Sequence, residues 1–271
     1  MSTVTSADGT RIAYDRIGEG PPVILVAGAT QYRAADQTSP ELARRLADGG
    51  HAVINYDRRG RGESGDTLPY APEREIEDLA ALVAEAGGGA SLFGMSSGAV
   101  LAAEAAARGV AITKLVMYEP PCKVDETGPY PGTRKEFDAY LATLDAATAA
   151  GRPGDAMEHF LEMVGMSKEE VEAFRGTPAW PAFEAVGHTI AYDGRIMEPF
   201  SLGEPIPAGR WAAALQPTLV LDGGDSPEWM RNAAAAVAAA LPNAKARTLP
   251  GQTHQFDPDV LAPVLLEFLG D

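Results

Sequence analysis

Residues 94–98 constrain the fold of this chain more than any others. They read Gly-Met-Ser-Ser-Gly, follow a short apolar segment at 90–93 and precede an alanine-rich segment at 99–108. A serine in a sharp strand-to-helix turn takes a strained backbone conformation, and flanking glycines place no Cβ where strand and helix pack closely. The pattern predicts a strand–turn–helix unit that exposes Ser96 as a nucleophile. The alternative is a glycine-rich turn whose serine only caps the helix.

Strand and helix signals alternate along most of the sequence. Two alternating segments around a turn predict a β-hairpin within residues 3–16, and short apolar runs predict buried strands at 23–27, 52–56, 90–93, 114–118, 218–221 and 246–249. Helical signals lie between these strands. The alternation predicts a mostly parallel sheet covered on both faces, with reactive groups at the carboxyl ends of its strands.

Serine-containing signals predict where three helices begin. Ser39 and Ser226 each precede a proline, which favours serine as the N-cap and proline as the first helical residue. The Ser-Lys-Glu-Glu run at 167–170 has the spacing of a capping box.

Residues 122–211 interrupt the alternation with apolar side chains at helical spacing. We therefore predict a core formed by residues 1–121 and 212–271, with a helical lid at 122–211 inserted between its two parts. Most aromatic and methionine side chains of this insertion are expected to pack its helices together, and some to cover an apolar pocket over Ser96.

Composition restricts the partners of the chain. A formal net charge of −16 and a pI near 4.6 argue against nucleic acid or an anionic membrane surface. The single cysteine, Cys122, excludes an internal disulfide and favours a cytoplasmic location, which the lack of a signal-like start in residues 1–20 also favours. The expected partner is a small-molecule substrate, and the sequence leaves open whether the protein is a homo-oligomer.

A serine nucleophile needs a base, and the chain offers four histidines. His51 precedes a predicted strand, at the wrong end of the sheet, while His159 and His188 lie in the insertion. His254 follows the last predicted strand, after the serine in chain order and at the carboxyl end of the sheet. We therefore predict His254 as the general base.

No cofactor and no metal are expected. The glycines at 60–62 and 87–89 lack the strand–glycine–helix arrangement and distal acid of a dinucleotide site. Four scattered histidines and one cysteine give no metal-ligand spacing.

These features together resemble the α/β-hydrolase superfamily over nearly the whole chain. The resemblance rests on the turn at 94–98, the Asp-Arg-Arg-Gly-Arg-Gly-Glu-Ser run at 57–64, the Tyr-Glu-Pro-Pro run at 118–121 and the Gly-Gln-Thr-His run at 251–254. The run at 57–64 is typical of a bacterial branch that includes small-ester serine hydrolases and cofactor-free haloperoxidase-like enzymes. The resemblance implies the α/β-hydrolase fold, a mostly parallel eight-stranded sheet flanked by helices, with a helical lid.

The resemblance also implies an oxyanion hole made of two backbone N–H groups. One belongs to Ser97, the residue after the nucleophile, and the other to Ala29. Most relatives have His-Gly where this chain has Ala27-Gly28, so a side chain that usually braces the loop is missing. The donors are main-chain groups, so the hole can survive this change.

The acid that orients His254 has two main candidates, and Asp222, at the end of a predicted strand, is a third. In many relatives it follows the strand after the lid, but Ser226 occupies that position here and Asp225 falls one residue earlier. In some relatives it follows the strand before the lid, where this chain has Glu119. Either carboxylate could fix the imidazole tautomer and stabilise the imidazolium.

The resulting hypothesis is a serine hydrolase with a Ser-His-acid triad. It would cleave a neutral, moderately hydrophobic ester, thioester or lactone through an acyl-enzyme. A serine at position 96 argues against the aspartate-nucleophile chemistry of related epoxide hydrolases and dehalogenases. Two alternatives remain: a non-hydrolytic enzyme on the same scaffold, such as a lyase, a C–C bond-cleaving enzyme or a cyclase, and a non-catalytic ligand-binding protein.

Overall fold

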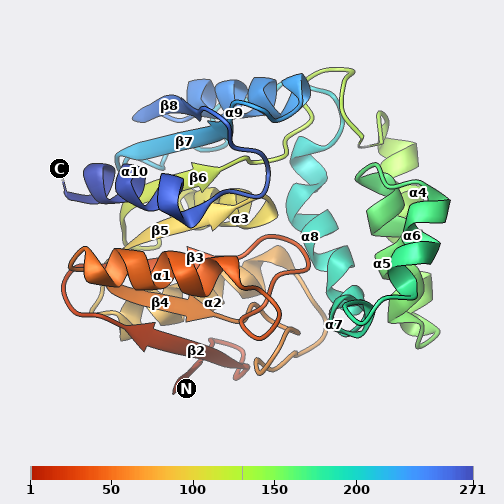
Figure 1. Cartoon of the computed structure of the whole chain (residues 1–271), viewed down its shortest axis with the longest axis horizontal. Coiled ribbons are helices and arrows are strands. Elements are labelled where there is room, and N and C mark those ends of the chain that lie inside the picture. Colours follow the sequence, from red (N-terminus) through yellow and green to blue (C-terminus); the bar gives the residue numbers. More distant parts are fainter. Residues whose placement is uncertain (1, 130, 271) are drawn as a thin grey trace.

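The computed structural model describes residues 2–129 and 131–270, and an eight-stranded sheet forms its centre (Figure 1). The strands are β1 (Ser2–Thr5), β2 (Arg11–Ile17), β3 (Pro22–Val26), β4 (Ala52–Tyr56), β5 (Ala90–Met95), β6 (Ile112–Tyr118), β7 (Thr218–Gly223) and β8 (Ala244–Leu249). Their order across the sheet is β1-β2-β4-β3-β5-β6-β7-β8. The pairs β1–β2 and β2–β4 are antiparallel, and the other neighbours are parallel. The predicted mostly parallel sheet of an α/β-hydrolase fold is confirmed.

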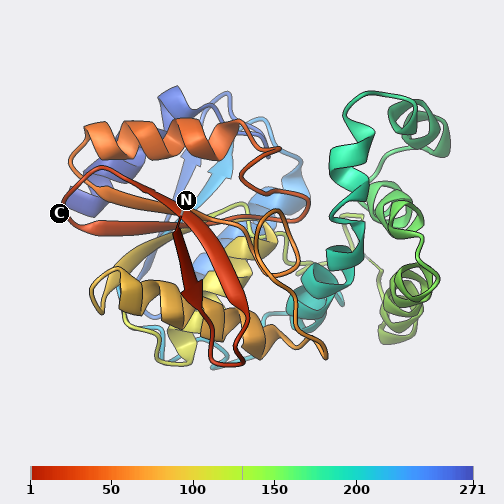
Figure 2. The ribbon, with the colours of Figure 1, turned by 90° about the horizontal axis from the view of Figure 1, so that it is seen from below.

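Helices cover both faces of the sheet (Figures 1 and 2). One face carries α1 (Thr38–Asp48) and α10 (Pro258–Gly270), and the other carries α2 (Pro72–Glu85), α3 (Ser97–Ala107) and α9 (Glu228–Ala240). Each face has its own apolar core: Leu42 and Leu265 belong to the first, and Leu79, Val100 and Val237 to the second. Inner strands such as β3 and β5 are buried on both faces, so they read as continuous apolar runs in the sequence.

Between β6 and β7 the chain forms helices instead of continuing the alternation. They are α4 (Arg134–Ala149), α5 (Pro153–Met163), α6 (Lys168–Arg175), α7 (Trp180–Glu184) and α8 (Ile190–Met197), with short 3-10 turns at Gly187–Thr189 and Glu198–Phe200. We call residues 134–200 the helical segment. It lies beside the carboxyl ends of the parallel strands (Figure 1) and has an apolar cluster of its own. The predicted lid at 122–211 contains this segment.

The N-termini of α6 and α1 differ in how well they match the sequence predictions. The capping box at α6 is confirmed, because Ser167 accepts from the backbone of Glu170 and the Glu170 carboxylate accepts from the backbone of Ser167. The prediction that Ser39 caps α1 is wrong. Asp36 accepts hydrogen bonds from the backbone N–H groups of Thr38 and Ser39 at 2.8 and 3.3 Å, and the helix begins at Thr38, two residues earlier than predicted.

None of the helices in residues 2–129 and 131–270 has both the length and the apolar character needed to cross a membrane.

Candidate active site

Ser96 lies in the turn between β5 and α3, in a conformation that non-glycine residues rarely adopt. Its φ and ψ are 55° and −128°. The turn is held because the Ser96 N–H donates to the Tyr118 carbonyl at 2.9 Å and the Ser96 carbonyl accepts from the Ala99 N–H at 3.0 Å. The Ser96 side chain makes no capping hydrogen bond to α3. Its hydroxyl therefore does not serve as a cap, and Ser96 lines a cavity instead.

The two glycines of the turn are required by close backbone contacts. A Cβ on Gly94 would lie 2.6 Å from the Ala99 Cα, and a Cβ on Gly98 would lie 2.4 Å from the carbonyl oxygens of Val26 and Ala27. These neighbours are main-chain atoms of adjoining elements, so they cannot move aside as a flexible side chain would.

Gly98→Ala is expected to lower the free energy of unfolding by about 1–3 kcal/mol, as overpacking of a rigid interior does. The matched control is Gly89→Ala, where the nearest atom to the added Cβ is 3.6 Å away and the effect should stay within about 1 kcal/mol. Urea denaturation of the two variants measures the difference. Equal unfolding midpoints would show that the turn tolerates a side chain.

Glu119 and His254 are joined by a hydrogen bond between Glu119 Oε2 and His254 Nδ1, at 2.8 Å. Glu119 directly follows β6 and is fully buried, while His254 lies in the loop between β8 and α10. An ionised carboxylate only accepts hydrogen bonds, so Nδ1 carries the proton and Nε2 is left as the acceptor. The Tyr118 hydroxyl donates to the Thr253 carbonyl at 2.6 Å and helps to hold the histidine loop.

The second carboxylate oxygen of Glu119 also accepts hydrogen bonds. Oε1 accepts from the Gly223 N–H at 2.8 Å and from the Ser226 hydroxyl at 2.5 Å. Burial alone raises the pKa of Glu119, but the hydrogen bonds from His254, Ser226 and Gly223 outweigh it, and the net pKa lies below its ordinary value. The carboxylate therefore stays ionised at neutral pH.

Of the two candidate acids, the structure brings Glu119 to the imidazole. Asp225 is exposed, and its backbone N–H donates to the Gln252 carbonyl at 2.9 Å. The prediction that Ser226 caps α9 is wrong, because Pro227 occupies the cap position and the Ser226 hydroxyl points to Glu119 instead. Ser226, which the resemblance places at the position of the acid in many relatives, instead donates to Glu119, the residue that follows β6.

Backbone strain is concentrated around this site. In residues 2–129 and 131–270, the non-glycine residues with positive φ are Thr30 at 65°, Ser96 at 55° and Glu119 at 45°. Such conformations cost about 1–3 kcal/mol each and persist where surrounding contacts hold them. Thr30, Ser96 and Glu119 follow the neighbouring strands β3, β5 and β6 at the same edge of the sheet.

Ala29 and Ser97, the predicted oxyanion-hole donors, both line the cavity that Ser96 lines. Ser97 is the first residue of α3, where backbone N–H groups have no partner within the helix. The loop that carries Ala29 is stabilised by an internal hydrogen bond, in which the Gly28 N–H donates to the Gln31 side-chain carbonyl at 2.7 Å.

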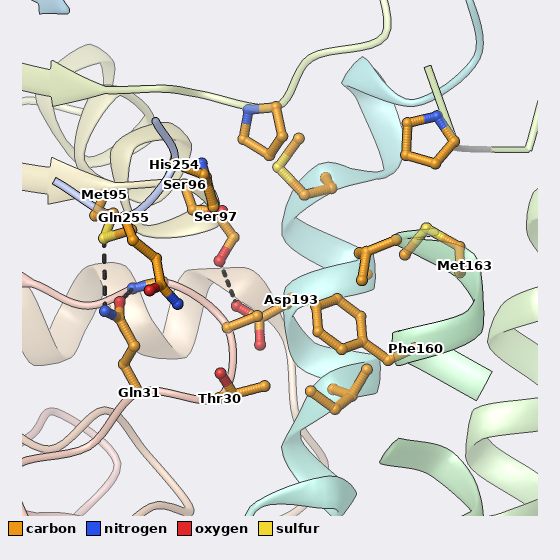
Figure 3. A pocket seen from close by; sticks show the side chains of 18 of the residues that line it. Thr30, Gln31, Met95, Ser96, Ser97, Phe160, Met163, Asp193, His254 and Gln255 are labelled. Atoms are coloured by element: carbon orange, nitrogen blue, oxygen red, sulfur yellow. Dashed lines mark hydrogen bonds between the residues drawn. The ribbon is translucent and has the colours of Figure 1, made fainter. Parts of the chain in front are cut away.

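The cavity has a volume of about 620 Å³ and lies between the sheet edge and the helical segment (Figure 3). Ser96, Ser97 and His254 face it from the sheet side, and Phe160 and Met163 face it from α5. Its other apolar lining residues include Phe137, Tyr140, Phe183, Ile190, Met197, Trp229 and Met230. No lysine or arginine occurs among the described residues that line it.

Sequence reasoning missed Asp193, which lies on the buried side of α8. The carboxylate lines the cavity and accepts a hydrogen bond from the Ser97 hydroxyl at 2.6 Å (Figure 3). A signal was present, because Asp193 falls between Ile190 and Met197 at helical spacing and places a charge on an apolar face.

Metal binding finds no support in the described part of the chain. In residues 2–129 and 131–270, no three or more histidine, cysteine, aspartate and glutamate side chains are grouped so that they could hold a metal ion.

Comparison with known proteins places the chain in a family. The alpha/beta hydrolase family matches residues 23–264. Among solved structures, an alpha/beta hydrolase from Sphaerobacter thermophilus DSM 20745 is 49% identical, with a TM-score of 0.86, and the match covers 99% of this chain and 100% of that one. No curated protein sequence matches the chain significantly.

More distant structures share the fold. An esterase from Exiguobacterium antarcticum is 19% identical, with a TM-score of 0.68 and coverage of 100% of this chain and 99% of that one. A bromoperoxidase from Bacillus anthracis is also 19% identical, with a TM-score of 0.68 and full coverage of both chains. The chain belongs to the alpha/beta hydrolase family and is an enzyme of the hydrolase type.

Proposed function

We propose that the protein cleaves a neutral, moderately hydrophobic carboxylic ester, thioester or lactone through an acyl-enzyme formed on Ser96. The observation that carries the proposal is the hydrogen bond between His254 Nδ1 and the buried Glu119 carboxylate. It leaves His254 Nε2 as a proton acceptor in the same cavity as the strained serine.

The chemistry follows from these positions. Ser96 Oγ attacks the acyl carbon while its proton passes to His254 Nε2, and Glu119 stabilises the imidazolium that forms. The oxyanion receives hydrogen bonds from the backbone N–H groups of Ser97 and Ala29. The imidazolium then protonates the leaving alcohol or thiol, and a water molecule activated by the same histidine releases the acid.

The substrate class is inferred from the cavity walls. Aromatic and methionine residues make up a third of the described lining residues, and the acidic ones are Asp36 and Asp193. An anionic acyl group would lose hydration without gaining a cationic partner, whereas a neutral one would bury apolar surface. The helical segment acts as the lid and supplies most of the aromatic and methionine side chains that line the cavity.

A fluorophosphonate probe and two matched esters test the proposal. The wild-type protein should gain the mass of one adduct, located at Ser96 by peptide mapping, and Ser96→Ala should gain none. The kcat/KM for p-nitrophenyl butyrate should exceed that for the anionic p-nitrophenyl hemisuccinate by about tenfold or more. A folded wild-type protein that forms no adduct and cleaves neither ester would refute the proposal.

A further inference from the structure

A single carboxylate of the helical segment is bonded to groups behind both halves of the oxyanion hole. Asp193 Oδ1 accepts from the Ser97 hydroxyl at 2.6 Å and from Arg58 Nη1 at 2.7 Å, and Asp193 Oδ2 accepts from Arg61 Nη2 at 2.5 Å. Asp193 and the three residues whose side chains donate to it are each at most 4% exposed. Ser97 and Asp193 are 96 residues apart in sequence, so this contact couples α8 to the start of α3.

Arg61 reaches the other half of the hole. Its Nη1 donates to the Gly28 carbonyl at 2.5 Å and to the Gln31 carbonyl at 3.3 Å. The Gly28 carbonyl and the Ala29 N–H belong to one planar trans peptide and point in opposite directions. A guanidinium fixed on the carbonyl therefore sets the direction of the Ala29 N–H and polarises it as a donor.

Arg58 completes the arrangement and balances its charge. Its Nη1 also donates to the Ala27 carbonyl at 3.2 Å, and its Nε and Nη2 hold Glu75 of α2 at 2.7 and 2.8 Å. Two buried guanidiniums thus face two buried carboxylates. Such a cluster is stable as a whole, but removal of one charge leaves the others uncompensated.

We propose that Arg58, Arg61 and Asp193 form a brace that orients both backbone donors of the oxyanion hole, with Asp193 as a positioning residue supplied by the helical segment. The inference rests on the proposed function. Here arginine side chains bond the carbonyls of Ala27 and Gly28 from behind the loop.

Asp193→Asn tests whether the brace stabilises the oxyanion of the transition state. It keeps the shape of the side chain but removes the charge that holds Arg58 and Arg61, so the hole should lose its alignment. We expect kcat for p-nitrophenyl butyrate to fall about 10²-fold, with KM changed less than about threefold. The affinity for a trifluoromethyl ketone, which adds to Ser96 and places an oxyanion in the hole, should fall by the same factor as kcat/KM.

Asp78→Asn is the matched control. Asp78 is also buried, and its carboxylate holds a neighbouring arginine, Arg59, at 2.7 and 3.1 Å. Arg59 contacts Asp8 and the Arg74 carbonyl rather than the oxyanion loop. This control should lose stability by a similar mechanism while kcat and ketone affinity per folded molecule stay at the wild-type level.

Ser97→Ala is a milder variant that leaves all the ion pairs in place. It removes only the hydroxyl that bonds Asp193, and we expect kcat and ketone affinity to fall together by about tenfold. This variant decides the matter if Asp193→Asn does not fold, and wild-type values for it would then overturn the inference.

The outcomes separate this inference from the proposed function. An active wild-type enzyme with wild-type kcat and ketone affinity in folded Asp193→Asn would overturn the brace alone. Equal losses of kcat in Asp193→Asn and Asp78→Asn would also overturn it, because the effect would then be general destabilisation. A wild-type protein that neither reacts with the probe nor cleaves esters would overturn both.

Discussion

Ser96→Ala is expected to lower kcat for ester cleavage on the order of 10⁶-fold, as loss of the nucleophile does in serine hydrolases. In the proposed mechanism this hydroxyl forms the acyl-enzyme, and no base or oxyanion donor can replace it. Initial rates with p-nitrophenyl butyrate, measured at high enzyme concentration beside a buffer blank, give the residual activity. The variant should fold normally, because alanine adds no atoms to the turn.

His254→Ala and the Ser96→Ala/His254→Ala double variant test whether the two residues act together. His254→Ala should lose about as much activity as Ser96→Ala. The double variant should lose no more than either one, because the two residues act as a unit in the proposed mechanism. Additive losses, or a Ser96→Ala rate within about tenfold of the wild type, would contradict nucleophilic catalysis by Ser96.

Glu119→Gln is expected to lower kcat about 10⁴-fold while Asp225→Asn leaves it near the wild-type value. The three donors around Glu119, from His254, Ser226 and Gly223, all require an acceptor. A side-chain amide can face one of them with its own N–H, and the imidazole would then take the tautomer whose Nε2 carries the proton and cannot accept one from Ser96. Asp225 is the matched control because it is an exposed carboxylate that follows the neighbouring strand β7 at the same edge of the sheet.

Stability as a function of pH gives an independent readout of the same variant. Because the pKa of Glu119 is lower in the folded protein than in the unfolded chain, its charge stabilises the fold above the unfolded pKa. That contribution is lost as the pH falls through the lowered folded value. The difference in unfolding free energy between wild type and Glu119→Gln should therefore be full at neutral pH and shrink in acid. A difference that does not change with pH would contradict an ionised Glu119.

The sequence by itself determined the features that depend on neighbouring residues. Apolar periodicity located the strands and helices, and the glycines of residues 94–98 predicted the strained turn at Ser96. Chain order then singled out His254, because parallel strands place their carboxyl ends at one edge of the sheet. The signals for the strands, the helices and the turn act over a few residues, and His254 needed only chain order and the general rule for parallel sheets in addition.

Only the tertiary structure decided which acid meets the histidine. Glu119 and Asp225 follow neighbouring strands, β6 and β7, at the same edge, so local sequence treats them alike. The difference lies in a contact between residues 135 positions apart and in donors that β7 and the loop after it present to Glu119.

The hydrogen bond from Ser97 to Asp193 is likewise decided only by the tertiary structure. It spans 96 positions and depends on how α8 packs against α3. Hydrogen bonds and ion pairs of this kind are set by packing between distant segments. Propensity and periodicity carry no information about them, because a side chain's partner is fixed only when the elements that hold both residues come together.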